Sequence, residues 1–280
     1  MTAGAMTRRR ASSVRVGGDL PVRVVAALGA LSLGLPVLVL LVRAVAGGAL
    51  AEAAGLRVVV DALVLSLVTT SASLVLSVAL GLPLAYVLAR RTFRGQTIVE
   101  TLVDLPIVLP PSVAGLALLL LLGRRGLLGE PLSLLGLTIP FTTIAVVLAQ
   151  TFTSAPFFIR SARSGFATVD RDLEDAARVD GGSERQVFRT ITVPLAATAL
   201  AAGLVLTWAR ALGEFGATIM FAGNVEGRTQ TLPLVFYGEF QGGDLDATIA
   251  AAAILVLAAF GVLVAVRLLR SGRVLDLRGA

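Results

Sequence analysis

Residues 170–194, DRDLEDAARVDGGSERQVFRTITVP, form a short polar segment between two long apolar stretches. Twelve of the residues from Arg160 to Arg189 are charged, six of them arginine and six aspartate or glutamate, so the charges cancel. The flanking stretches are long enough to cross a bilayer, whereas so many charges in the hydrocarbon interior would cost too much free energy. The segment is therefore predicted to lie in water at the membrane surface, where it would serve as a docking surface.

The capping signals in this segment predict two short helices. Asp170 is a suitable N-cap, because a short acidic side chain accepts hydrogen bonds from the free N–H groups of a first turn. Gly181 and Gly182 would end that helix, since the position after a helix end favours glycine. Ser183 followed by Gln186 fits the capping box of a second helix. One face of the first helix would be small and apolar apart from one acid: Leu173, Ala176, Ala177 and Asp180.

The composition is that of an integral membrane protein. Hydrophobic residues make up 56% of the 280-residue chain, the mean hydropathy is +0.89 and 15% of residues are charged. Soluble domains are about 25% charged. The chain has no cysteine and no histidine, which excludes disulfides, thiol nucleophiles and imidazole bases, and no metal site is expected.

Every one of the 24 basic residues is arginine. Without lysine the chain cannot form a Walker A phosphate-binding loop, so nucleotide chemistry would require another polypeptide. The pI of about 11.2 is typical of nucleic-acid-binding proteins. The arginines, however, are scattered beside apolar stretches rather than gathered on one soluble face, so we expect a lipid bilayer and no nucleic acid as their surroundings.

The fold class expected is an all-α membrane protein with six transmembrane helices, because a bilayer core takes roughly 20 apolar residues in a helix. The six expected spans are 21–45, 60–89, 98–122, 141–163, 191–222 and 245–269. Three arginines precede the first span, as they would in a signal peptide. Its apolar core is too long for one, so the first span is predicted to be a retained anchor.

The arginines also predict the orientation. Eighteen lie in the tails and loops on one side of the membrane, and six lie on the other side or within a span. By the positive-inside rule, the N- and C-termini and the charged loop are expected in the cytoplasm. Residues 1–20 and 270–280 would then be cytoplasmic tails.

Two spans contain residues that break helices. Pro106, Pro110 and Pro111 lie in the third span, and Gly81 and Pro83 lie in the second. A broken helix in hydrocarbon must find other partners for its freed backbone groups, so such breaks face protein or a water-filled cavity. A plain structural kink is the alternative. Small residues in the fifth span would suit a transport path, a dimer contact or ordinary helix packing.

The charged loop resembles a known motif. The run from Asp175 to Pro194 reads D-A-A-x3-G-x9-I-x-V-P, and it resembles the E-A-A-x3-G-x9-I-x-L-P loop of permease subunits of ATP-binding-cassette (ABC) importers. Asp175 stands where the family has glutamate, although Glu174 precedes it, and Val193 stands for leucine. Asp180 occupies a usually apolar position. The residues expected to couple to an ATPase are Glu174, Asp175, Ala176, Ala177, Gly181, Ile191 and Pro194.

This resemblance implies a type-1 ABC importer permease fold, with residues 58–269 as the ABC transmembrane type-1 domain of five helices. It further implies that the chain is not an enzyme and binds no cofactor, because ATP and Mg would be bound by a partner ATPase. The implied partners are a second copy of the chain, a cytoplasmic ABC ATPase dimer and an external binding protein. The implied location is the bacterial cytoplasmic (inner) membrane, as a multi-pass protein.

The run from Arg210 to Phe236 contains the candidate substrate residues. Arg210 and Glu214 are four residues apart in an apolar span, so they would pair on one helix face, either along a transport path or as a neutral lock between helices. Beyond them, four residues offer hydrogen-bond donors that suit a tetrahedral oxyanion, or are plain loop residues. These four are Asn224, Arg228, Thr229 and Gln230.

The same run resembles oxyanion permeases. ARALGEFGA at 209–217 is similar to a motif shared by the molybdate and sulfate branches, and 220–234 is similar to the molybdate branch. The resemblance implies a molybdate permease with an external molybdate-binding protein. Sulfate, thiosulfate and tungstate permeases remain alternatives, as does a secondary oxyanion transporter. A membrane-embedded enzyme is a further alternative, but Glu100 and Asp104 are expected to be interfacial or dimer contacts rather than a catalytic pair.

Overall fold

The computed structural model describes residues 20–50 and 57–276, and within these ranges the regular structure is entirely helical. The expected tails at 1–20 and 270–280 therefore fall largely or partly outside the described residues. In chain order the helices are α1 (Leu20–Ala46), α3 (Arg57–Arg90), α4 (Gln96–Val108), α5 (Pro111–Leu122), α6 (Gly129–Leu134), α7 (Thr143–Ala167), α8 (Arg171–Val179), α9 (Glu184–Val187), the π-helical turn η1 (Phe188–Thr192), α10 (Val193–Leu212), α11 (Gly216–Phe221), α12 (Leu232–Gly242) and α13 (Leu245–Asp276).

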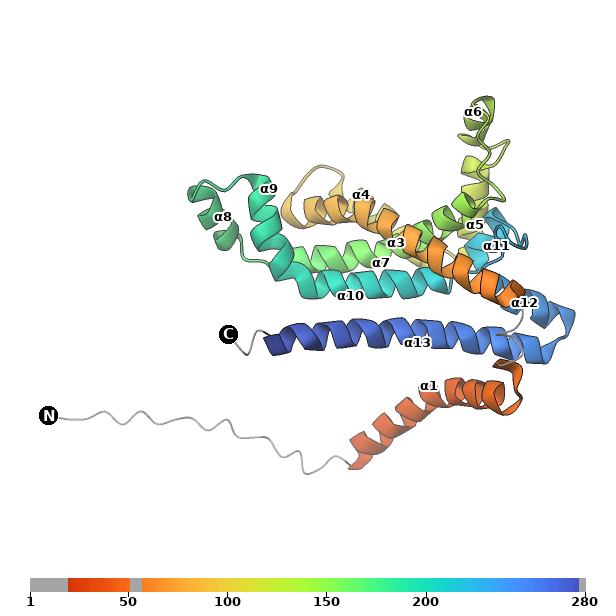
Figure 1. The fold of residues 1–280 in the computed structure, drawn as a ribbon. Helices are drawn as coiled ribbons and strands as arrows, with labels where there is room; N and C mark the ends of the chain where they lie inside the picture. Colours follow the sequence, from red (N-terminus) through yellow and green to blue (C-terminus); the bar gives the residue numbers. More distant parts are fainter. Residues whose placement is uncertain (1–19, 51–56, 277–280) are drawn as a thin grey trace.

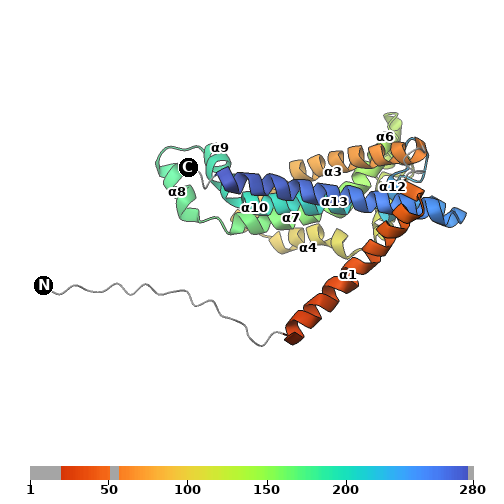
Figure 2. The ribbon, with the colours of Figure 1, turned by 60° about the horizontal axis from the view of Figure 1, so that its bottom comes forward.

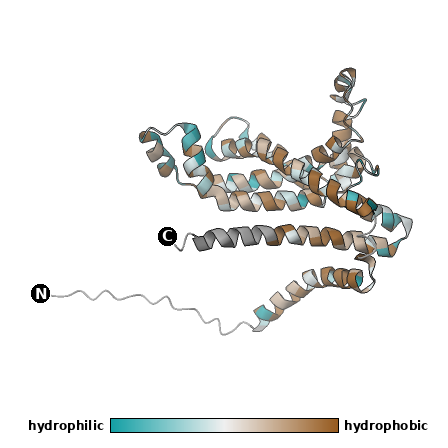
Figure 3. Cartoon of the chain, viewed as in Figure 1, coloured by the Kyte–Doolittle hydropathy of each residue, from teal (hydrophilic) through white to brown (hydrophobic). Residues whose placement is uncertain are grey.

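Five helical stretches are long and apolar enough to cross a membrane. They are Pro21–Ala46, Arg57–Arg90, Thr143–Ala167, Glu184–Leu212 and Leu245–Val264. Four of them, α3, α7, α10 and α13, run side by side, while α1 diverges from this bundle and approaches it near one end of α13 (Figures 1 and 2). Apolar residues dominate these long helices, and polar residues gather on α8 and α9 at one end (Figure 3).

The expected span 98–122 is divided into α4 and α5, which are bent by 119° and form a broken span or a re-entrant loop. The break falls at Leu109 and Pro110, which are extended with ψ angles of 135° and 133°. Two consecutive prolines remove two backbone donors, and a residue before proline avoids helical angles, so the helix stops there. Pro106 lies within α4 and does not break it.

The second and fifth spans differ from expectation in the opposite sense. Gly81 and Pro83 do not interrupt α3, which is continuous from Arg57 to Arg90. Gly81 instead permits close packing, because a Cβ atom there would lie 2.9 Å from Ile159 on α7. The fifth span, expected to reach residue 222, ends at Leu212, where three non-helical residues separate α10 from α11.

The core that positions the polar end lies between α3, α7 and α10. Phe158, Phe166 and Ala162 of α7 are buried against Ala85 of α3 and Ala196 of α10. Small residues set the spacing of these helices, since a Cβ atom on Gly165 of α7 would lie 2.5 Å from the Cβ of Ala199 on α10. The small residues of α10 thus include several that serve ordinary helix packing.

Candidate functional site: the α8–α9 hairpin and the charged pairs of the bundle

The α8–α9 hairpin forms as its capping signals predict. The Asp170 side chain accepts a hydrogen bond from a first-turn N–H at 3.0 Å. Gly181 follows α8 with φ +89°, and Gly182 donates a backbone hydrogen bond across the turn to Ala177 O at 2.9 Å. The capping box between Ser183 and Gln186 begins α9. Each bond is local, so the hairpin has a definite shape before any partner binds.

The second arm of the hairpin continues into the membrane-length helix α10 without a break. After the four residues of α9, the chain makes one π turn, η1, whose wider ring is closed by Val193 N–H bonding to Phe188 O. The turn comes just before Pro194, which has no N–H to offer to the helix. Ile191 is half-buried within this turn. The connection is therefore helical throughout, and α9, η1 and α10 form one continuous helical stretch.

Glu174 ties α8 to two other elements. Its side chain is only 4% exposed, and one oxygen accepts hydrogen bonds from Arg90 at 2.8 Å and from the Thr192 hydroxyl at 2.6 Å. The same Arg90 nitrogen donates to the carbonyl of Val169 at 3.1 Å. One buried carboxylate thus joins the end of α3, the first helix of the hairpin and η1.

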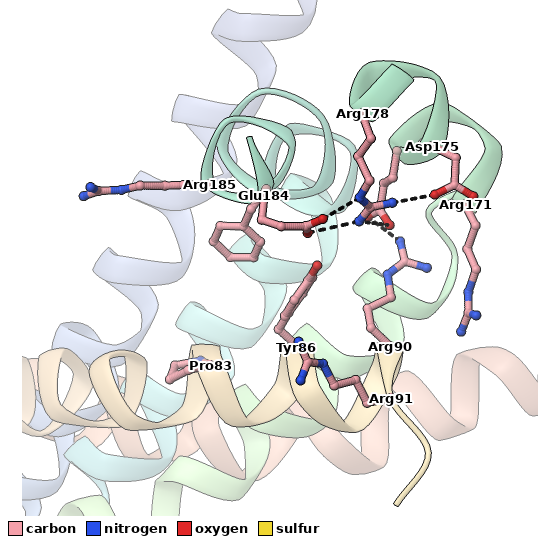
Figure 4. Close-up of a pocket in the computed structure, with 11 residues that line it drawn as sticks. Pro83, Tyr86, Arg90, Arg91, Arg171, Asp175, Arg178, Glu184 and Arg185 are labelled. Atoms are coloured by element: carbon pink, nitrogen blue, oxygen red, sulfur yellow. Dashed lines mark hydrogen bonds and ion pairs between the residues drawn. The ribbon is translucent and has the colours of Figure 1, made fainter. Parts of the chain in front are cut away.

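Asp175, which the motif aligns with the family's glutamate, has a different environment. Its side chain is 67% exposed and pairs with Arg178 at 2.6 Å. Arg178 also pairs with Glu184 of α9 at 2.7 Å, and hydrogen bonding to that carboxylate raises the pKa of Arg178 (Figure 4). The buried structural acid is therefore Glu174, and Asp175 belongs to a surface network that joins α8 to α9.

The loop motif does not indicate Arg90 or Thr192 as site residues, because neither occupies one of its defined positions. Both become visible once α3 and η1 are placed next to α8. An aromatic cluster seals the same junction: Tyr86 packs edge-on against Phe166 and Phe188, with ring centroids 5.7 and 5.0 Å apart. A cavity of about 640 Å³ remains beside this cluster, between the end of α3 and the hairpin.

The outer side of α8 presents apolar side chains to solvent. Val179 is 87% exposed and Leu173 is 50% exposed, Ala176 is exposed, and Ala177 is half-buried. Apolar residues at the most accessible point of an otherwise charged hairpin are typical of an interaction site. The hairpin therefore has the two properties of a docking element, an exposed apolar face and a rigid attachment.

Arg210 and Glu214 pair at the opposite end of α10. Their ion pair measures 2.6 Å, and the Glu214 side chain is 1% exposed. Glu214 lies beyond the last residue of α10, so the pair spans the helix end rather than one helix face. The other Glu214 oxygen accepts the backbone N–H of Ala217 at 2.8 Å. Glu214 thereby holds the start of α11 to the end of α10.

The four expected donors beyond this pair have divergent environments. The Thr229 hydroxyl is buried and accepts the N–H of Val225 at 2.9 Å, so it holds its own loop. Gln230 lines a cavity of about 310 Å³ beside α3, together with Asp61 and Glu226, whose negative charges would repel an anion. Asn224 and Arg228 are exposed.

Glu100 and Asp104 of α4 pair with arginines of α7 in the same chain. Glu100 lies 2.8 Å from Arg163, and Asp104 lies 3.3 Å from Arg160. The two pairs form an antiparallel ladder between α4 and α7. The sequence predicts interfacial or dimer contacts for these two acids, whereas the partners that the structure shows lie within the chain.

Comparison with known proteins agrees with the fold and with the expected family. The family described as "Binding-protein-dependent transport system inner membrane component" matches residues 77–272. The molybdenum transport system permease protein ModB of Mycobacterium bovis is 46% identical over 198 residues, which are 71% of this chain and 75% of the relative. ModB of Escherichia coli K12 is 42% identical over 190 residues, 67% of this chain and 83% of the relative.

A solved structure shows the same fold at much lower identity. It is a bacterial alginate ABC transporter in complex with an alginate pentasaccharide-bound periplasmic protein, and its TM-score is 0.70 at 16% identity, over 88% of this chain and 91% of that one. The apolar helices together with these permease relatives make the chain a multi-pass membrane protein. The chain belongs to the family of binding-protein-dependent transport system inner membrane components.

Proposed function

We propose that the chain is the permease subunit of a molybdate importer, a transport protein rather than an enzyme. The assignment of molybdate as the substrate is supported by the 46% and 42% identity to two molybdenum permeases over at least two thirds of the chain. The observation that carries the importer mechanism is the capped α8–α9 hairpin with its exposed apolar face. ATP and Mg would be held by a partner ATPase, and no cofactor by this chain.

The proposed topology has six spans, with α4 and α5 counted as one broken span and both termini in the cytoplasm. It is supported by the excess of arginines at the α8–α9 end and in the two tails. Under this topology the hairpin lies in the cytoplasm, and residues 58–269 form the transmembrane domain. The proposed location is the cytoplasmic membrane of a bacterium.

The proposed partners are a second copy of this chain, a cytoplasmic ATPase dimer and an external molybdate-binding protein. The solved alginate transporter, which was captured with a periplasmic protein, supports the last of these. The exposed apolar face around Leu173 and Val179 supports the proposal of an ATPase partner. This face is mostly apolar, and a partner that covered it would remove apolar surface from water. That burial would stabilise the complex.

The structure suggests how movement would pass from the ATPase to the membrane. A force on α8 would reach α3 through the buried bond from Arg90 to Glu174, and would reach η1 through Thr192. The unbroken helix from α9 to α10 would carry it across the bundle. Coupling to both α3 and α10 would make the hairpin move the bundle as a unit rather than bend on its own.

Uptake by the assembled transporter tests this function. The chain would be co-purified with the ATPase and binding protein of its source genome and reconstituted in liposomes that contain ATP. We expect labelled molybdate to accumulate and to be displaced by a tenfold excess of unlabelled molybdate. If sulfate or thiosulfate competes as well as molybdate does, the molybdate assignment is wrong; tungstate would distinguish a tungstate permease in the same way.

A further inference from the structure

The ion pair between Arg160 and Asp104 occupies an unusual position for two charges. Both lie in apolar helices, and at about 1.5 Å per residue Arg160 is roughly 10 Å from the end of α7. Their side chains are nevertheless 62% and 42% exposed. A charge that faces hydrocarbon is costly, and an aspartate is too short to reach the membrane surface from that depth. This face therefore requires water or another protein beside it.

The face is part of a groove of about 710 Å³ between α7 and α10, with Ile107 of α4 at its side. Arg160 is the charged residue that lines it, and several hydroxyls accompany it. Ser164 and Thr198 are exposed, and their hydroxyls make no hydrogen bond to residues 21–50 or 57–264, whose side chains the structure describes. These groups remain available as donors. The rest of the lining is mostly small, which leaves the groove open.

The chemistry of the groove suits a tetrahedral oxyanion. Asp104 engages Arg160 through Nε, which leaves the two terminal guanidinium nitrogens for a bidentate contact with two oxygens of one anion. The nearby carboxylate would weaken that contact. Weak binding is what a path requires, because an anion must leave each site as readily as it enters.

We propose that this groove is the cytoplasmic half of the anion's path, and that Arg160 is the residue that contacts the anion there. This inference rests on the proposed function and extends it. It places the inner contact on α7 and α10, far along α10 from the Arg210–Glu214 pair. Arg163 provides an internal comparison, since it forms the neighbouring ion pair but does not line the groove.

Cysteine accessibility tests whether the groove contains water. The chain has no native cysteine, so Ser164→Cys or Thr198→Cys introduces a single thiol. In inside-out vesicles that carry the assembled transporter without ATP, we expect a membrane-impermeant cationic thiosulfonate to modify both thiols. Leu102→Cys is the control, because it lies at the depth of Asp104 on the opposite face of α4 and should react at least tenfold more slowly. If Ser164→Cys and Thr198→Cys react no faster than the control, lipid or a dry subunit interface fills the groove, and the proposal is wrong.

Transport by charge variants tests the role of Arg160. We expect Arg160→Gln to lower the rate of molybdate uptake at least tenfold and to raise the number of ATP molecules hydrolysed per anion, with partial rescue by Arg160→Lys. Arg163→Gln is the matched control and should stay within about twofold of the parent. Equal losses in the two glutamine variants would indicate a structural role for both pairs and would overturn the proposal.

The two experiments separate this inference from the proposed function. If the parent protein does not transport molybdate, the proposed function is wrong, yet thiol accessibility still reports whether the groove is aqueous. If the parent transports molybdate and the two thiols are unreactive, the path runs elsewhere and only this inference fails. Protection of the thiols by millimolar molybdate would support both.

Discussion

The buried bond network of Glu174 makes the sharpest prediction about the hairpin. Replacement of Glu174 with alanine removes the acceptor for both Arg90 and the Thr192 hydroxyl. Breaking a buried ion pair from one side costs about 3–5 kcal/mol, because the remaining charge loses its partner. Arg90 retains its bond to the Val169 carbonyl, so the cost should be at the lower end, about 3 kcal/mol.

A loss of about 3 kcal/mol corresponds to roughly a hundredfold change in the equilibrium that holds α8 on the bundle, since 1.4 kcal/mol is about tenfold. Asp175→Ala is the matched control. Its side chain is mostly exposed, and surface ion pairs contribute about 0–1 kcal/mol. The motif alone would predict the larger effect for Asp175, because Asp175 stands where the family has glutamate.

Hydrogen exchange of the assembled transporter measures this difference. We expect the backbone amides of α8 to exchange at least tenfold faster in Glu174→Ala than in Asp175→Ala, and stimulation of ATP hydrolysis by the loaded binding protein to be lost only in the former. Adding Arg90→Leu to Glu174→Leu should restore part of the protection, because no buried charge then remains. If Asp175→Ala has the larger effect, the assignment of Glu174 as the structural acid is refuted.

Three further predictions concern other parts of the chain. Ala177→Arg should abolish substrate-stimulated ATP hydrolysis while the protein stays folded in membranes, because a long charged side chain would obstruct the face of α8; unchanged stimulation would contradict it. Glu214→Ala should block uptake, since Arg210 would be left without its partner; normal uptake across a range of pH would show that the pair is incidental. Gly165→Val should lower the apparent melting temperature of the purified complex, because the added side chain would force α7 and α10 apart at a cost of about 1–3 kcal/mol. Gly34→Val should not lower it, because the space around Gly34 is open.

Features that depend on neighbouring residues could be predicted from the sequence. Asp170 and Gly181 act within one helical turn of their own positions, and their side-chain or backbone preferences are strong enough to decide the ends of α8. Long apolar stretches were equally predictable, because a membrane-length helix needs only length and composition.

Features that depend on distant residues could not be predicted. Glu174 and Arg90 are 84 residues apart, and nothing in either local sequence indicates their contact. Adjacent acids in the motif made Asp175 the natural assignment, and only the position of α3 distinguishes the two. The presence of a proline likewise did not show whether a helix would end there. Pro106 and Pro83 are accommodated inside helices, whereas the consecutive pair beginning at Pro110 ends one. The difference lies in how many successive backbone donors are missing.

The π turn at η1 also determines the azimuth of the hairpin around the axis of α10. A π turn contains one more residue than an α turn, and each residue of an α-helix advances by about 100° around the axis. Deletion of one residue from Phe188–Thr192 that restored a regular helix would therefore swing α8 by about 100°. Glu174 would then point away from α3. The extra residue of η1 thus rotates α9 about the helix axis relative to α10. This rotation allows the α8–α9 hairpin to face α3 while α10 packs against α7.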